Sequence, residues 1–191
     1  MKLPELKLLR RLSNETRHLH PYLMTYETET GVKTYEMVSQ NPDLHKHSLP
    51  VPCGTVMVVL GPDKSRLLLC REFRMAVNKV IYNLPSGFSE PGETPEQTAA
   101  RELKEETGLD LLQVLHTLPP SFIAPPVTDM SAHTVICTAK GILNPEQNPN
   151  EVIQPRWFTR EELKRELENH SLWFSARALD AAVMFLNLLN T

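Results

Sequence analysis

The chain has 191 residues, of which 41% are hydrophobic and 23% charged, and its formal net charge is −3. This length and apolar content predict a single folded domain of ordinary size and exclude a disordered or low-complexity chain. The nearly balanced charge argues against a protein that wraps nucleic acid or docks on an anionic membrane, and no aliphatic run is long enough to cross a bilayer.

The first part of the chain favours β-structure. Residues 22–27 and 32–39 are rich in strand-forming side chains and flank Gly31, which predicts a hairpin. Residues 40–52 carry three prolines among polar side chains and indicate a loop. We therefore expect an N-terminal extension at 1–50 with a β-hairpin, followed by a larger domain at 51–191.

The larger domain is predicted to alternate strands and helices. The expected strands are 54–60, 66–72, 80–84, 111–117, 132–139 and 155–158, and the expected helices are 94–108, 159–169 and 175–190. Thr94 with Gln97 and Thr159 with Glu162 have capping-box spacing, and Gly108 fits a helix end. This order predicts an α/β (α+β) fold, a mixed β-sheet sandwiched between helices.

Negative charge is concentrated between Gly87 and Leu109, where six glutamates face only Arg101 and Lys104. Three of those glutamates, Glu102, Glu105 and Glu106, share one face of the predicted helix because they are three or four residues apart. Arg101 can reach Glu105, but a single guanidinium does not balance three carboxylates. Converging carboxylate oxygens are the ligands that Mg²⁺ or Mn²⁺ prefers, and the backbone carbonyl of Ser86 is a candidate further ligand.

This segment resembles the Nudix box of the Nudix hydrolase family, whose pattern is Gx5Ex7REUxEExGU with U aliphatic. Every specified position matches: Gly87, Glu93, Arg101, Glu102, Leu103, Glu105, Glu106, Gly108 and Leu109. The resemblance implies the Nudix fold and a catalytic site in which Glu102, Glu105 and Glu106 bind Mg²⁺, with Mn²⁺ as a substitute. It also implies that Arg101, together with Glu93, orients these carboxylates.

Flanking residues resemble the ADP-ribose pyrophosphatase branch of that family. Arg71-Glu72-Phe73-Arg74 and the run from Asn83 to Gly87 are similar to a Gln-Tyr-Arg-like run followed by Glu-Leu-Pro-Ala-Gly. This similarity implies substrate contacts by Arg74, Arg71 and Gly87. Asn83 stands where the branch has Glu, and Ser86 where it has Ala.

Two downstream segments extend the resemblance. The run Pro125 to Asp129 occupies the place of a Ser-Pro-Gly-x-(Ser/Thr)-(Asp/Glu) loop, with the stiffer Pro126 replacing Gly. Glu151 lies in an acidic loop before a Trp-containing strand, and by resemblance it is the candidate for the carboxylate that activates water. Its alternative role is that of an ordinary solvated loop glutamate.

The resemblance implies Mg²⁺-dependent hydrolysis of the pyrophosphate bond of a nucleoside diphosphate derivative, favouring ADP-ribose, which yields AMP and ribose 5-phosphate. The alternatives are another substrate (a nucleotide sugar, a dinucleoside polyphosphate, NADH or coenzyme A) or a non-catalytic nucleotide-binding module. Members of this branch often form homodimers through the N-terminal strands, which gives residues 22–39 that expected role. The expected partner is therefore the small-molecule substrate, with no nucleic acid and no membrane.

The cysteines and the N-terminus bear on the compartment. Cys53, Cys70 and Cys137 are widely spaced and form no CxxC pair, which indicates free thiols in a reducing environment. The first twelve residues mix lysine, glutamate and arginine with leucine, unlike a signal peptide. We expect a cytoplasmic protein.

Overall fold

The computed structural model describes the backbone of residues 5–11 and the whole of residues 17–45, 52–145, 153–169 and 172–187. The chain divides into two compact units. The first comprises Met1–Cys53 and Pro120–Ala132, and the second comprises Gly54–Pro119 and His133–Thr191. The return of residues 120–132 to the first unit had no signal in the sequence.

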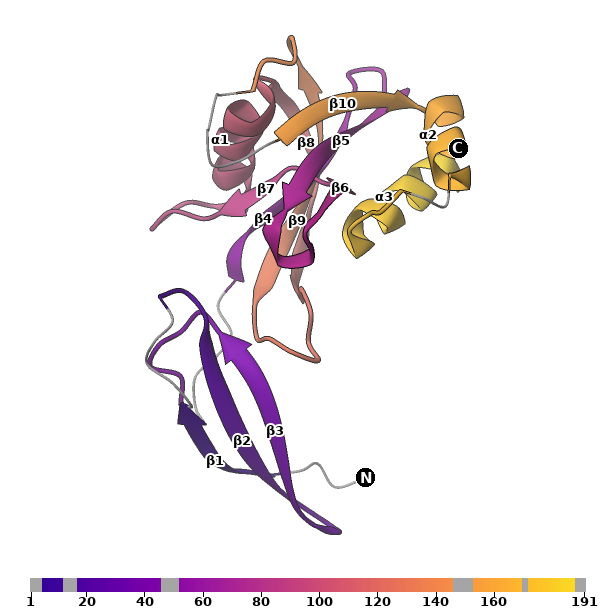
Figure 1. Cartoon of the computed structure of the whole chain (residues 1–191). Helices are drawn as coiled ribbons and strands as arrows, with labels where there is room; N and C mark the ends of the chain where they lie inside the picture. Colours follow the sequence, from indigo (N-terminus) through magenta and orange to yellow (C-terminus); the bar gives the residue numbers. More distant parts are fainter. Residues whose placement is uncertain (1–4, 12–16, 46–51, 146–152, 170–171, 188–191) are drawn as a thin grey trace. The chain divides into compact units, whose positions relative to one another are not determined.

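The first unit contains a three-stranded antiparallel sheet in the order β1-β2-β3 (Figure 1). Its strands are β1 (Glu5–Arg11), β2 (His20–Thr28) and β3 (Gly31–Ser39). The predicted hairpin is confirmed: Gly31 turns the chain with a φ of +124°, and Thr28 Oγ1 donates to its carbonyl at 2.7 Å. Strand β1 was not predicted from the sequence.

The segment from Pro120 to Ala132 is tied to β3 by hydrogen bonds. Val38 N donates to Val127 O at 2.9 Å, and the Tyr35 hydroxyl donates to Pro126 O at 2.6 Å. Ser39, whose side chain is buried, donates its Oγ–H to Asp129 Oδ2 at 2.9 Å. The run from Pro125 to Asp129 therefore belongs to the same compact unit as the N-terminal sheet.

The second unit is built on a seven-stranded sheet in the order β10-β5-β4-β9-β8, with β6 paired to β5 and β7 paired to β4. These strands are β4 (Pro52–Leu60), β5 (Arg66–Arg74), β6 (Lys79–Asn83), β7 (Ser86–Phe88), β8 (Asp110–Phe122), β9 (Ser131–Lys140) and β10 (Ile153–Thr159). A short 3-10 turn, Met75–Val77, connects β5 to β6. The turn and β7 were not predicted.

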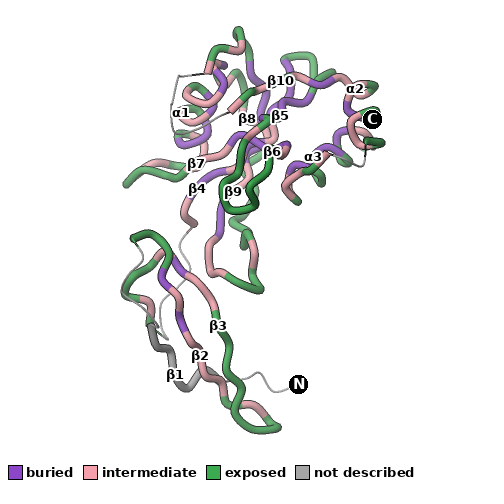
Figure 2. Tube along the Cα trace, viewed as in Figure 1, coloured by how far each residue is buried: buried purple, intermediate pink, exposed green. Residues whose placement is uncertain are grey.

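Helices cover both faces of this sheet (Figure 1). The helices are α1 (Pro95–Thr107), α2 (Arg160–Glu168) and α3 (Ala176–Asn187). Leu68 of β5 packs in a core with Leu103 of α1, whereas its neighbours Leu67 and Leu69 pack with Phe185 of α3. This alternation is what a strand buried on both faces requires, and Figure 2 shows the buried centre of the sheet. The predicted α/β sandwich is confirmed.

In the part of the chain that the structure describes, no helix combines the length and hydropathy needed to span a membrane.

Candidate active site

Helix α1, which carries the three clustered carboxylates, has well-defined ends. Thr94 Oγ1 accepts from Gln97 N, and Gln97 Oε1 accepts from Thr94 N, so the predicted capping box is confirmed. Gly108 ends the helix with a φ of +77°, and a Cβ there would lie 2.5 Å from Asn144 O. These two ends fix the axial position of every side chain between them.

Strand β7 runs beside α1, and three contacts join them residue by residue. Phe88 O accepts from Arg101 Nη2 at 2.8 Å, and Ser86 N donates to Glu106 Oε2 at 3.0 Å. Between these two contacts, Gly87 lies against Glu102, because a Cβ on Gly87 would be only 1.8 Å from Glu102 Cδ. The glycine is required here for close approach, since its φ is not in the left-handed region.

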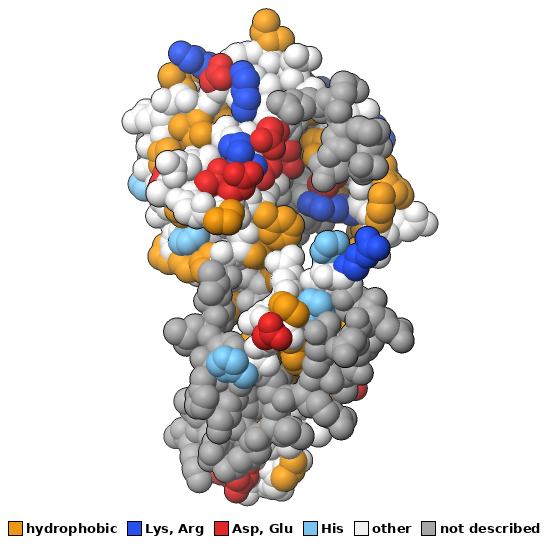
Figure 3. Space-filling model, turned by 90° about the vertical axis from the view of Figure 1, so that its left-hand side faces the viewer, with side chains coloured by type: hydrophobic (Ala, Val, Ile, Leu, Met, Phe, Trp, Pro, Cys, Tyr) orange, Lys and Arg blue, Asp and Glu red, His pale blue; other side chains and the backbone are white. Residues whose placement is uncertain are grey.

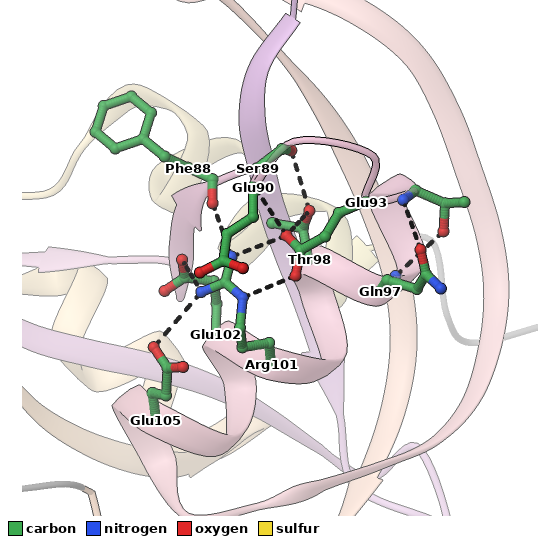
Figure 4. A network of polar contacts seen from close by, with 10 residues as sticks. Phe88, Ser89, Glu90, Glu93, Gln97, Thr98, Arg101, Glu102 and Glu105 are labelled. Atoms are coloured by element: carbon green, nitrogen blue, oxygen red, sulfur yellow. Dashed lines mark hydrogen bonds and ion pairs between the residues drawn. The ribbon is translucent and has the colours of Figure 1, made fainter.

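Arg101 holds the loop before the helix through a fork-like ion pair with Glu93. Arg101 Nε lies 2.9 Å from Glu93 Oε1, and Nη2 lies 2.9 Å from Oε2 (Figure 4). Glu93 Oε2 also accepts from the Thr98 hydroxyl and from Glu90 N, each at 2.9 Å. The Arg101 hydrogen bonds, followed by the Glu90 amide, lower the pKa of Glu93 to about 2. Glu93 therefore stays ionised and fastens the loop to the helix.

The same guanidinium reaches two of the clustered carboxylates. Arg101 Nη1 lies 2.7 Å from Glu102 Oε1 and 3.6 Å from Glu105 Oε2. Glu102 is 14% exposed in its side chain, whereas Glu105 is 44% exposed. On the face shown in Figure 3, which is the side where α1 lies in Figure 1, acidic side chains gather around basic ones.

The chemistry of this donor set fits a divalent cation. Glu102, Glu105 and Glu106 supply hard oxygen donors from one helix, and Glu106 also approaches the backbone of Ser86. In the geometry described, Arg101 and the Ser86 amide engage Glu102 and Glu106. Within the described ranges, no group of three His, Cys, Asp or Glu side chains is arranged to hold a metal ion.

Strand β5 separates the two arginines that were compared with substrate ligands. Arg74 is an even-numbered residue, like Leu68, so it lies on the α1 face, where it pairs with Glu72 (Nε to Oε1, 3.0 Å). Arg71 alternates to the opposite face, and its cross-strand partner Tyr82 packs in the core beneath α2 and α3. The two arginines thus point to different sides of the sheet.

Glu72 of β5 and Glu106 of α1 both lie near the thiol of Cys70, on the same side of the sheet. Burial, followed by the charges of Glu106 and Glu72, holds the pKa of the Cys70 thiol well above its usual value. Glu72 was not named among the site residues from the sequence, although its position two residues before Arg74 on a strand places both side chains on one face. Glu151, the candidate base, lies outside the described residues.

Comparison with known proteins identifies the family of the chain. The NUDIX domain family model matches residues 51–178. The chain belongs to the Nudix family. It resembles the ADP-ribose pyrophosphatase branch of that family, whose members generally use divalent metal ions.

Individual relatives share about 30% identity. An ADP-ribose pyrophosphatase of Bacillus subtilis (strain 168) is 27% identical over 137 residues, which cover 71% of this chain and 72% of that protein. The NAD-capped RNA hydrolase NUDT12 of Homo sapiens is 31% identical over 140 residues, covering 71% of this chain but 29% of that protein. A relative from Caenorhabditis elegans is 30% identical over 131 residues, covering 65% of this chain and 59% of its own length. The chain thus spans only part of some of its relatives.

The fold has a solved counterpart. The crystal structure of an ADP compounds hydrolase superposes with a TM-score of 0.73 at 18% sequence identity, covering 96% of this chain and 92% of that one. At this identity the similarity concerns the fold, and it confirms the Nudix architecture of strands and helices described above.

Proposed function

We propose that this Nudix enzyme hydrolyses the pyrophosphate bond of ADP-ribose, with Mg²⁺, to give AMP and ribose 5-phosphate. The observation that carries the proposal is the register of β7 against α1. In this register the Glu102 side chain packs against Gly87, and Glu106 accepts a hydrogen bond from the Ser86 amide. A helix that served only solubility would not need a glycine at residue 87 to make room for a carboxylate. The similarity to an ADP-ribose pyrophosphatase supports the choice of substrate.

In this proposal, Glu102, Glu105 and Glu106 hold the cation, with the Ser86 carbonyl as a further ligand. Mg²⁺ held there would neutralise charge on the pyrophosphate and make a water molecule a better nucleophile. Arg101 keeps the carboxylates in place, since its fork to Glu93 anchors the loop and its Nη1 reaches Glu102. The water adds its oxygen to one phosphorus, the bridging P–O bond breaks, and each product leaves with one phosphate.

Two residues complete the proposed reaction. Arg74 faces the α1 side of the sheet and is 48% exposed in its side chain, which suits contact with a phosphate or ribose. Glu151 is the proposed base that removes a proton from the attacking water. Arg71, on the opposite face of β5, is proposed as a substrate contact from family resemblance alone, as is the backbone of Gly87.

A turnover panel with Mg²⁺ and with Mn²⁺ tests the proposal. The substrates are ADP-ribose, a nucleotide sugar, a dinucleoside polyphosphate, NADH and coenzyme A, with product identification by chromatography. We expect the highest kcat/KM for ADP-ribose. Preferential cleavage of another compound of the panel would keep the reaction class and replace ADP-ribose as the substrate, and binding without turnover across the panel would favour a non-catalytic module.

We also propose that the enzyme is a cytoplasmic homodimer. Val32 of β3 is 73% exposed, as an apolar side chain on an uncovered strand would be before a second copy binds. Cys70 and Cys137 are buried free thiols, which suits a reducing compartment. Light scattering of the purified protein tests the dimer: a mass near twice that of the chain is expected, and a monomer at micromolar concentration contradicts it.

A further inference from the structure

A chain of four polar side chains crosses β5 and β6 at one end of the sheet. Ser175 donates its Oγ–H to Asn83 Oδ1 at 2.8 Å, and Asn83 Nδ2 donates to Glu72 Oε2 at 3.0 Å. The other oxygen of Glu72 lies 3.0 Å from Arg74 Nε. The residues come from the loop before α3, from β6 and from β5, so the chain spans three segments of the second unit.

The first member of this chain is firmly held. Ser175 N donates to Tyr82 O at 2.9 Å, and its carbonyl accepts from Leu179 N at 3.0 Å in the first turn of α3. Its Oγ accepts from Ala178 N at 3.2 Å, so its single hydroxyl proton is available for Asn83. Asn83 Oδ1 is thereby the acceptor and Nδ2 the donor, which directs an N–H at Glu72.

Glu72 is thus fixed from one side and holds Arg74 from the other. Its side chain is 12% exposed, so its carboxylate depends on these two partners for the hydrogen bonds that water would give. Arg74 is 48% exposed and, among the described residues, pairs with Glu72 alone, through Nε. Pinning Nε leaves the edge formed by the two terminal nitrogens for a bidentate contact with an anion.

This arrangement explains the departure at residue 83. The ADP-ribose pyrophosphatase pattern has an amide two residues before the arginine and a carboxylate at the position of Asn83. Here Glu72 supplies the carboxylate and Asn83 the amide, and a direct hydrogen bond joins them across the two strands. Glu72 therefore places a carboxylate next to Arg74.

We infer that Glu72, oriented by Asn83 and Ser175, is a positioning residue that sets the Arg74 guanidinium for bidentate contact with an anionic oxygen pair of the substrate, such as a phosphate. The inference rests on the proposed function, and it identifies the contact by which the site recognises an anionic group of the substrate. Glu72 acts through Arg74 and is not itself placed on the reacting atoms.

A double-mutant cycle on the full chain, with ADP-ribose and Mg²⁺, tests the inference. Glu72→Gln keeps the size of the side chain and a hydrogen-bond acceptor but removes the charge that holds Arg74. We expect Glu72→Gln and Arg74→Ala each to raise KM about tenfold with kcat within about twofold of the parent. The double variant should resemble Arg74→Ala, because both changes act on one interaction.

Asp110→Asn is the matched control. It removes an ion pair of similar length, Lys104 Nζ to Asp110 Oδ1 at 2.9 Å, from an exposed position. We expect it to leave KM unchanged. A merely structural role for Glu72 would lower the melting temperature of Glu72→Gln and leave KM of the folded protein unchanged, and this result, or additive effects in the double variant, would overturn the inference.

Equilibrium binding of ADP-ribose without metal separates this inference from the proposed function. If wild type fails to turn over ADP-ribose but Glu72→Gln weakens its binding about tenfold, the positioning role stands and the proposed reaction falls. If wild type turns over ADP-ribose and Glu72→Gln matches it in KM and Kd, the reaction stands and the positioning role falls. Failure of wild type both to bind and to hydrolyse ADP-ribose contradicts both.

Discussion

Gly87 and Glu102 lie so close together that a side chain on residue 87 has no room, because a Cβ there would lie 1.8 to 2.3 Å from the Glu102 carboxylate group. The obstructing atoms are the end of a flexible side chain and not backbone, so the fold can accommodate a methyl group by moving the carboxylate. The glycine therefore sets the position of one proposed metal ligand and has little part in stability.

The first prediction concerns Gly87→Ala. We expect a folded protein with a melting temperature near that of wild type and a loss of about 100-fold in kcat, since a displacement of about 1 Å in a catalytic group can cost that much. Ser86→Ala is the control, because the Ser86 contact with Glu106 uses only the backbone amide. Activity near wild type in Gly87→Ala would contradict the account.

Gly108→Ala should behave in the opposite way. Its Cβ would meet the backbone of Asn144 at 2.5 Å, and its φ of +77° disfavours any residue with a side chain. We expect a loss of at least about 1 kcal/mol in the free energy of unfolding, measured by urea denaturation. Stability equal to that of wild type would show that this helix end tolerates an ordinary residue.

The ion pair between Arg101 and Glu93 predicts a specific dependence of stability on pH. The folded-state pKa of Glu93 is about 2, below its ordinary value of 4.5. Because this pKa is lowered, the stabilisation is complete above pH 4.5 and is lost as the pH falls toward 2. Melting temperatures between pH 2.5 and 6 should therefore fall less steeply for Arg101→Met than for wild type, and parallel curves would contradict this coupling.

Ser39 tests the contact between β3 and the loop at 120–132. Its buried hydroxyl donates to Asp129 and accepts from Asn41 N, so Ser39→Ala leaves two polar groups without this partner. We expect a loss of about 1–3 kcal/mol in the free energy of unfolding and faster amide hydrogen exchange at 123–130. Ser65→Ala, at an exposed turn, is the control and should change stability by less than about 0.5 kcal/mol.

Local signals predicted the parts of this protein that local interactions determine. Thr94 with Gln97 and Gly108 located α1, and Gly31 located the first hairpin, because caps and turns depend on neighbouring residues. Strand β7 is only three residues long and is stabilised by pairing with β4. A segment this short has no periodic pattern from which a strand could be predicted. The attachment of residues 120–132 to β3 likewise depends on partners about 90 residues away.

The candidate site shows the same division. Sequence spacing was enough to predict that Glu102, Glu105 and Glu106 share one helix. It also predicted the contact of Arg101 with Glu105, whose Nη1 and Oε2 atoms lie 3.6 Å apart. Arg71 and Arg74 lie on opposite faces of β5 because side chains alternate along a strand. Similarity to a short family motif does not by itself indicate this. The pairing of Asn83 with Glu72 depends on the register of β5 and β6, which only the fold supplies.

The most direct measurement of the central claim is the hydrolysis of ADP-ribose by wild type and Glu106→Gln, with Mg²⁺ and with EDTA, followed by product analysis. Glutamine keeps an acceptor for the Ser86 amide, so the variant should fold, and equal melting temperatures serve as the check. The account predicts AMP and ribose 5-phosphate from wild type only when Mg²⁺ is present, with kcat at least about 100-fold lower in Glu106→Gln. Hydrolysis that persists in EDTA, or a wild-type kcat in Glu106→Gln, would contradict it.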